Sequence, residues 1–157
     1  MKYIWLVGIF LICHALRAQE HIEYVEERYC LAEAVYYEAR GEKLEGKLAV
    51  SGVILERVVS RNFPNTICKV VHDGVYLNGV IMRNRCAFSY YCDGKREPMK
   101  DVIAREDAFY IADLALQGIL YTETEGATFY HASYVSPEWA NDFTFLGRVG
   151  YHLFYAE

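Results

Sequence analysis

The sequence predicts an α+β fold that is mainly helical and carries a small β-hairpin. Helix-forming runs cover residues 29–40, 45–60 and 101–118. Two segments near the C-terminus, 127–133 and 148–157, alternate apolar and polar residues as short paired strands do. With 157 residues, 54% of them hydrophobic, the chain has enough apolar surface for one core, so one domain is expected.

Local signals set the expected boundaries of these elements. Gly41 is expected to end the first helix in a left-handed cap, and Gly118 to stop the third. Thr66 is expected to cap a short helix over residues 67–73, and Asp101 stands near the start of the third long helix. Residues 73–98 follow no regular period and are predicted to be irregular. In the second helix, five apolar residues recur near the helical period: Leu48, Ala49, Val53, Leu55 and Val59.

The N-terminus is typical of a secretory signal. Lys2 supplies a positive start and residues 4–13 form an apolar run, which is too short for a bilayer span of about 20 residues. Ala15 and Ala18 offer cleavage points, with Ala18 favoured. Residues 1–18 are therefore predicted to be a signal peptide and residues 19–157 the functional domain. The alternative is an uncleaved anchor.

Charge and cysteine content bear on partners and compartment. Removing residues 1–18 takes away Lys2 and Arg17 and no acid, so the net charge moves from −5 to −7, which argues against a nucleic-acid partner. Four cysteines then remain, an even number that indicates disulfides in an oxidising compartment: Cys30, Cys68, Cys86 and Cys92. Zinc is disfavoured because no C-x-x-C or paired Cys/His spacing occurs. The location expected is periplasmic or secreted.

Glu38 stands out among the four glutamates of residues 30–46. On a helix it ends an apolar stripe of Leu31, Ala34 and Val35, whereas Glu33 falls on another face, where it can be solvated or paired. Apolar surroundings raise the pKa of a carboxyl, which suits a general acid near neutral pH. The alternative is that Glu38 caps a backbone or pairs with Arg40 or Arg57.

The segment YYEARGEKLEGKLAVSGVILERV resembles the motif of the SleB-type cell wall hydrolases, whose spore-cortex members are lytic transglycosylases. The similarity continues, in order, through FPNTICKVV, CAFSYYCDG, ATFYHASYVSPEWA and GYHLFYAE, and it covers residues 30–156. It implies a lysozyme-like, goose-type transglycosylase-like catalytic domain. It also implies that Glu38, the first glutamate of E-A-R-G-E, is the catalytic residue. The sequence departs from relatives at Glu56 and Ala87, where they typically carry Asn and Gln.

The resemblance also points to further site residues in CAFSYYCDG, where the alternative is a stapled structural turn: Phe88, Ser89, Tyr90 and Asp93. A bridge between Cys86 and Cys92 would close this loop and leave Cys30 to pair with Cys68, although four cysteines allow three connectivities. Fourteen tyrosines fit either a sugar-binding cleft or a tyrosine-rich core.

Tyr130 and His131 alternate on a predicted strand and so point to opposite faces. His131 fits either a saccharide hydrogen bond or a structural role, Trp139 either a sugar stack or a core position, and His152 a structural role.

The expected activity is cleavage of the bond between N-acetylmuramic acid and N-acetylglucosamine in peptidoglycan glycan strands. Glu38 would serve as acid and then base, without cofactor or metal, in a monomer that is free of the membrane after signal removal. Three alternatives stay open: a muramidase in which Asp93 or Glu42 positions a water, an amidase acting on the stem peptide, and a non-catalytic glycan-binding protein.

Overall fold

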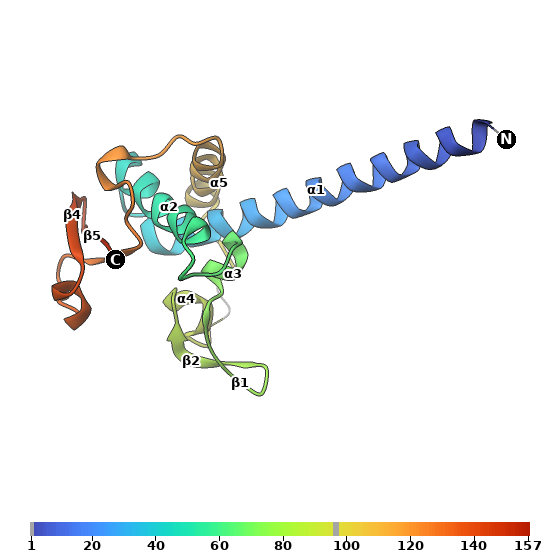
Figure 1. Ribbon diagram of the computed structural model, residues 1–157. Helices are drawn as coiled ribbons and strands as arrows, with labels where there is room; N and C mark the ends of the chain where they lie inside the picture. Colours follow the sequence, from blue (N-terminus) through green and yellow to red (C-terminus); the bar gives the residue numbers. More distant parts are fainter. Residues whose placement is uncertain (1, 96–97) are drawn as a thin grey trace.

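The computed structural model describes residues 2–95 and 98–157, with side chains from Arg17 onward except Ala18. The helices are α1 (Lys2–Ala39), α2 (Leu44–Val59), α3 (Ile67–Val71), α4 (Ser89–Cys92) and α5 (Val102–Leu116), with 3-10 turns at Thr122–Thr124 and Glu138–Asn141. The strands are β1 (Gly74–Leu77), β2 (Val80–Cys86), β3 (Phe129–Ala132), β4 (Thr144–Val149) and β5 (His152–Ala156). α1 enters the body as a long rod, and α2 and α5 pack around its C-terminal half (Figure 1).

α1 is longer than the predicted helix and begins at Lys2. Residues 9–28 contain no glycine or proline that would interrupt it. The prediction of a left-handed cap at Gly41 is wrong, since the φ angle of Gly41 is not positive. The helix ends instead in a turn that the Glu42 N–H closes by donating to the Ala39 carbonyl at 2.9 Å. The predicted signal sequence falls on the first part of α1, where most side chains lie outside the described residues. In the described part of the chain, no helix has an apolar stretch of the length that a membrane crossing requires.

The remaining predicted helices form, with their expected caps. The Thr66 hydroxyl accepts from the Lys69 N–H at 3.3 Å and begins α3. The Asp101 carboxylate accepts from the Ala104 N–H at 3.1 Å and begins α5, which Gly118 follows with a left-handed φ of 83°. Of the predicted apolar stripe of α2, Leu48, Ala49 and Val53 are buried. Leu55 is half-buried, and Val59 is exposed at the end of the helix.

Residues 73–98 were predicted to be irregular, and this prediction is wrong for part of the segment. β1 and β2 form an antiparallel hairpin in which Leu77 pairs with Val80, so the loop is the two residues Asn78 and Gly79. Both have positive φ angles, 51° and 77°, as a tight type I′ hairpin turn demands. The Asn-Gly pair was therefore the available signal for this hairpin.

The C-terminal sheet has three strands in the order β3-β5-β4, all antiparallel. The predicted pairing of residues 127–133 with the last segment is confirmed, since Tyr130 lies opposite Phe154. The last segment is not one strand, however. Gly150, with φ 55°, turns the chain so that residues 148–149 end β4 and residues 152–156 form β5.

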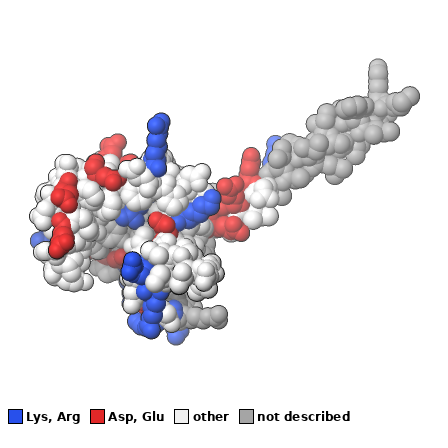
Figure 2. All heavy atoms as spheres, turned by 60° about the horizontal axis from the view of Figure 1, so that its bottom comes forward, with Lys and Arg blue, Asp and Glu red and all other residues white. Residues whose placement is uncertain are grey.

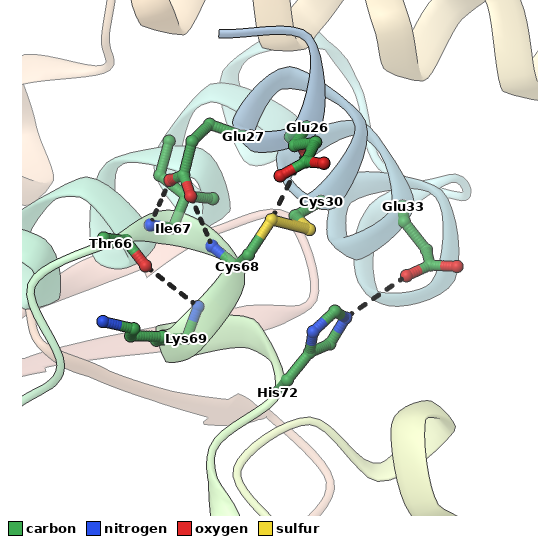
Figure 3. The surroundings of a disulfide bond; sticks show 9 residues. All are labelled: Glu26, Glu27, Cys30, Glu33, Thr66, Ile67, Cys68, Lys69 and His72. Atoms are coloured by element: carbon green, nitrogen blue, oxygen red, sulfur yellow. Dashed lines mark hydrogen bonds and ion pairs between the residues drawn. A yellow bond between two sulfur atoms is a disulfide. The ribbon is translucent and has the colours of Figure 1, made fainter. Parts of the chain in front are cut away.

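Two hydrophobic clusters make up the core. The larger lies between α1, α3 and α5, and the smaller joins α2 to the C-terminal sheet. Of the three possible connectivities the structure has Cys30–Cys68 and Cys86–Cys92. The first bridge ties α1 to α3 beside Glu27, whose carboxylate accepts from the Ile67 and Cys68 N–H groups at the start of α3 (Figure 3).

Candidate functional site

Glu38 lies in the last turn of α1, at the end of the predicted apolar stripe. Leu31 and Ala34 are fully buried and Val35 is 1% exposed, which fixes this face of the helix toward the core. Glu38 itself is partly buried. Its neighbours Tyr36 and Ala39 belong to different hydrophobic clusters, so the carboxyl stands where the two clusters meet.

Tyr130 on β3 is the hydrogen-bond donor to this carboxyl. Its hydroxyl donates to Glu38 Oε2 at 3.1 Å, and its ring packs against both clusters. Burial, and then the charge of Glu38, raise the pKa of Tyr130 well above its usual range. The phenol therefore stays protonated and remains a donor whatever the charge state of Glu38.

The environment of Glu38 favours its protonated form. Burial raises the pKa of the Glu38 carboxyl, while the Tyr130 hydrogen bond and the positive charge of Arg57 lower it in part. A carboxyl with a raised pKa can hold a proton nearer to neutral pH, as a general acid must. The same two groups stabilise the carboxylate once that proton has left.

Neither arginine named as an alternative partner forms an ion pair with Glu38 among the described residues. The Arg40 guanidinium lies over the Tyr36 ring, 5.3 Å from its centroid, and is exposed. The Arg57 Nε donates to the Thr128 carbonyl at 2.7 Å. Glu38 is thus influenced by the charge of Arg57 without being neutralised by direct contact.

Arg57 is a buried cation, only 8% exposed, on the inner face of α2. Its guanidinium lies over three aromatic rings, with centroid distances of 5.0 Å to Phe63, 5.5 Å to Phe88 and 5.4 Å to Phe129. Phe88 was expected in the cleft, but it is only 2% exposed. Its ring therefore packs against the Arg57 guanidinium and presents no surface to a ligand.

The other candidates of the CAFSYYCDG loop differ in their surroundings. Tyr90 stacks on Tyr37 with ring centroids 4.5 Å apart, and burial, with contributions from nearby charges including Glu38, raises its pKa far above the usual range. Ser89 is exposed at the start of α4. Asp93 accepts from the Lys95 N–H at 2.8 Å and closes a turn. Of the four, Tyr90 is the residue whose pKa the charge of Glu38 raises.

A hollow of about 360 Å³ opens beside this tyrosine stack. Tyr37 and Tyr90 line it together with Glu33 and His72, whose carboxylate Oε2 and ring Nε2 stand 3.8 Å apart. Glu33 thus lies close enough to His72 for an ion pair when the imidazole is protonated, one of the two roles that its face of the helix allowed. The flat rings give this hollow the aromatic surface that sugar rings pack against.

His131 and Trp139 belong to the opposite face of the C-terminal sheet from Tyr130. His131 is buried, with Nε2 3.0 Å from the Tyr155 hydroxyl and Nδ1 3.0 Å from the Ala132 carbonyl. Trp139 packs edge-on against His131 and Tyr155 and at a tilt against Phe129. This aromatic cluster holds the sheet together, and neither residue contacts Glu38.

Glu42 is tied to the turn between β4 and β5. Its Oε1 accepts from the Tyr151 N–H at 2.9 Å and lies 3.1 Å from His152 Nδ1, with side chains 6% and 12% exposed. Burial lowers the pKa of His152, and the charge of Glu42 opposes that effect. The β4–β5 turn therefore holds Glu42 through Oε1, which argues against the alternative in which this carboxylate positions an attacking water.

From the sequence, Arg57 was named only as an alternative ion-pair partner of Glu38. The position of Tyr37 in the hollow and the contact between Glu42 and His152 were not predicted. Arg57 had a signal, since Val50, Val53, Ile54 and Arg57 fall on one face of α2 as Leu31 to Glu38 do on α1. The pair had none, because it joins residues 110 positions apart in the sequence.

Comparison with known proteins places these observations in a family. The model of the Cell Wall Hydrolase family matches residues 41–155, a span that begins three residues after Glu38. The spore cortex-lytic enzyme of Bacillus subtilis (strain 168) is 33% identical over 127 residues, covering 79% of this chain and 35% of that enzyme. The enzyme of the same name from Halalkalibacterium halodurans is 32% identical over 125 residues, covering 79% and 33%. The chain thus spans about a third of the length of these relatives.

Two solved structures share the fold. The catalytic domain of the germination-specific lytic transglycosylase SleB from Bacillus anthracis is 28% identical with a TM-score of 0.59, covering 82% of this chain and 93% of that one. The catalytic domain of the Bacillus cereus SleB protein is 25% identical with a TM-score of 0.56, covering 82% and 88%. The predicted lysozyme-like, mainly helical fold is confirmed. The family model matches well over half of the sequence, and the chain belongs to the cell wall hydrolase family.

Proposed function

We propose that this protein cleaves peptidoglycan glycan strands as a lytic transglycosylase, cutting the β-1,4 bond between N-acetylmuramic acid and N-acetylglucosamine. The observation that carries the proposal is Glu38, a partly buried carboxyl with a raised pKa and a protonated phenol as its hydrogen-bond donor. Family membership, and the likeness to a catalytic domain described as a lytic transglycosylase, support the substrate class.

In the first step, protonated Glu38 gives its proton to the glycosidic oxygen. The bond from that oxygen to C1 of the muramic acid breaks, and positive charge develops on the sugar in an oxocarbenium-like transition state. Glu38 is left as a carboxylate, which the Tyr130 hydroxyl and the charge of Arg57 stabilise.

In the second step, the carboxylate takes the proton of the muramic C6 hydroxyl. The oxygen of that hydroxyl attacks C1 of the same sugar and forms a 1,6-anhydro end, which returns Glu38 to its protonated state. One carboxyl serves both transfers, and the intramolecular nucleophile competes with water through proximity.

The rival functions differ in what they require. A muramidase usually recruits a second carboxylate for water, but Glu42 is held by the β4–β5 turn and Asp93 closes a turn of its own. An amidase would need a metal or a nucleophile. The four cysteines beyond the predicted signal are paired in disulfides. A non-catalytic glycan-binding protein would have no use for a buried acid with a raised pKa.

We also propose that residues 1–18 direct export and are removed, so that the domain acts in the periplasm or outside the cell. The two disulfides support this location, because such bonds persist in oxidising compartments. Mass spectrometry of exported protein tests it: the mature chain should begin near residue 19. A mass that retains residues 1–18 would show that the segment is an anchor instead.

The deciding experiment is digestion of purified sacculi, with the released fragments analysed by liquid chromatography and mass spectrometry. Wild-type protein should produce 1,6-anhydromuramic ends, and Glu38→Gln should lose about 10²–10⁴-fold in rate while keeping its fold. Glu23→Gln, at an exposed position of the same helix, is the matched control and should keep full activity.

Each other product has its own meaning. Fragments heavier by one water, with reducing muramic ends, would identify a muramidase. Free stem peptides with intact glycan would identify an amidase, and binding without products a glycan-binding protein. Full activity in a folded Glu38→Gln variant would refute the assignment of the acid.

A further inference from the structure

Glu42 is a nearly buried carboxylate for which the proposed reaction has no use. It follows α1 by three residues and is fixed from the far end of the chain, by the Tyr151 N–H and by His152 on β5. Burying a charged group costs free energy unless the charge is paired. A buried carboxylate at this turn therefore indicates that Glu42 has a role there.

Two glycines on separate elements leave the space that this carboxylate fills. A Cβ on Gly150 would stand 1.8 Å from Glu42 Oε2, and a Cβ on Gly46 of α2 would stand 2.9 Å from Glu42 Cβ. Gly150 also has the positive φ that glycine tolerates best. The first turn of α2 and the β4–β5 turn thus both pack closely against the Glu42 carboxylate.

Aromatic contacts link the Glu42–His152 pair to Glu38. The ring of His152 meets the ring of Tyr130 edge-on, at 88° with centroids 5.2 Å apart, and Phe154 lies against Tyr130 at 5.8 Å. Phe154 is opposite Tyr130 in the sheet and His152 is two residues before it, so the side chains share one face. The Tyr130 hydroxyl then reaches Glu38 Oε2.

We infer that Glu42 and His152 are positioning residues that hold the Tyr130 ring in place and, through it, orient Glu38 for proton transfer. The inference rests on the proposed function of Glu38 and deepens it. The Glu42 carboxylate lies 3.1 Å from His152 Nδ1 and so limits the space in which the imidazole ring can move. That ring is in turn in edge-on contact with the ring of Tyr130. A small displacement of a reacting group is enough to slow a reaction considerably.

The charged and titratable groups around Glu38 and His152 determine how the reaction rate depends on pH. Glu38 faces Tyr130 from β3, Arg57 from α2 and Tyr90 from α4, while His152 faces Glu42 and His131. Glu38 must be protonated to act as the acid, so its pKa sets the alkaline limb of the rate profile. Loosening the Tyr130 hydrogen bond raises that pKa and moves the limb to higher pH.

The test uses the full mature protein with four variants: Glu42→Gln, His152→Ala, Tyr130→Phe and the double variant Glu42→Gln/Tyr130→Phe. For Glu42→Gln we expect kcat to fall about tenfold or more with KM unchanged, and the alkaline limb to move in the direction seen in Tyr130→Phe. Adding Glu42→Gln to Tyr130→Phe should bring little further loss, because both changes act on one contact. Glu45→Gln, an exposed acid at the start of α2, is the control and should leave every value unchanged.

A direct readout keeps this proposal separate from the proposed function. The Glu38 carboxyl is titrated by carbon-13 NMR in the wild type and in each variant, which needs no substrate. We expect its pKa to rise in Glu42→Gln, and in His152→Ala if Glu42→Gln does not fold. An unchanged Glu38 titration, or effects of Glu42→Gln and Tyr130→Phe that simply add, would overturn the positioning role. Activity in Glu38→Gln would overturn the proposed function instead.

Discussion

The Tyr130 hydroxyl donates to Glu38 Oε2 at 3.1 Å across 92 positions of sequence. The contact joins the last turn of α1 to a strand of the C-terminal sheet, so the acid depends on two parts of the fold at once. A carboxyl buried without this donor would have an even higher pKa, and its carboxylate form would be more costly.

Tyr130→Phe should therefore alter the pH dependence as well as the rate. The variant keeps the ring and removes the donor, so the pKa of Glu38 should rise and the alkaline limb of kcat should move to higher pH. The rate should fall because the carboxylate formed in the first step loses a hydrogen bond. Tyr155→Phe, which removes a hydroxyl on the other face of the sheet, is the control and should leave the limb in place. An unmoved limb in Tyr130→Phe would contradict the role of this hydroxyl.

Glu38→Gln should stabilise the protein at neutral pH. Because burial raises the folded-state pKa of Glu38, the wild type loses stability as the pH rises through that pKa, whereas an amide has no charge to bury. Thermal unfolding followed from pH 8 downward should give the variant the higher Tm, by about 2–4 °C for each kcal/mol. The difference should shrink with acid and vanish below about pH 3, where glutamate is protonated in both the folded and the unfolded state. A difference that is constant with pH would contradict the raised pKa.

The two disulfides should contribute unequally to stability. Cys30–Cys68 closes a loop with a sequence separation of 38, whereas Cys86–Cys92 closes one of 6. The chain-entropy relation gives about 4 kcal/mol for the long loop and about 2 kcal/mol for the short one. Replacing both cysteines of each bridge by serine and measuring urea unfolding compares them. Equal losses would mean that loop length does not govern their contribution.

Gly150→Ala should destabilise the protein more than Gly126→Ala. Both glycines have positive φ angles, 55° and 80°, so each substitution costs about 1–2 kcal/mol in backbone strain. A Cβ at position 126 meets no atom within 4 Å, but at position 150 it would displace the Glu42 carboxylate. Unfolding free energies of the two variants measure the difference. Equal values would show that Glu42 moves aside without loss.

Much of the helical architecture could be predicted because its signals are local. The Thr66 and Asp101 caps, the Gly118 stop and the buried stripe ending at Glu38 depend on residues within one or two turns. The Asn78-Gly79 turn was equally local, and a hairpin there was predictable from the same rules.

The surroundings of Glu38 could not be predicted in the same way. Tyr130 and Arg57 reach it from other elements, and no spacing along the chain encodes which side chains meet when a sheet docks on a helix. The strand alternation did separate Tyr130 from His131. It could not say which of the two faced Glu38, and the register against β5 decided it.

The N-terminal part of α1 is fastened to the body before the helix reaches Glu38. Glu27, Arg28 and Cys30 fasten the helix to α3 and α5, with Arg28 Nη2 2.8 Å from Asp113 Oδ2. Acidic side chains gather just before this anchorage, where the rod leaves the body (Figure 2). Cys30 precedes Glu38 by eight residues, about 12 Å of helix. A pull on the rod, or a molecule bound along it, would therefore load the bridge and α3 before any strain reached the carboxyl.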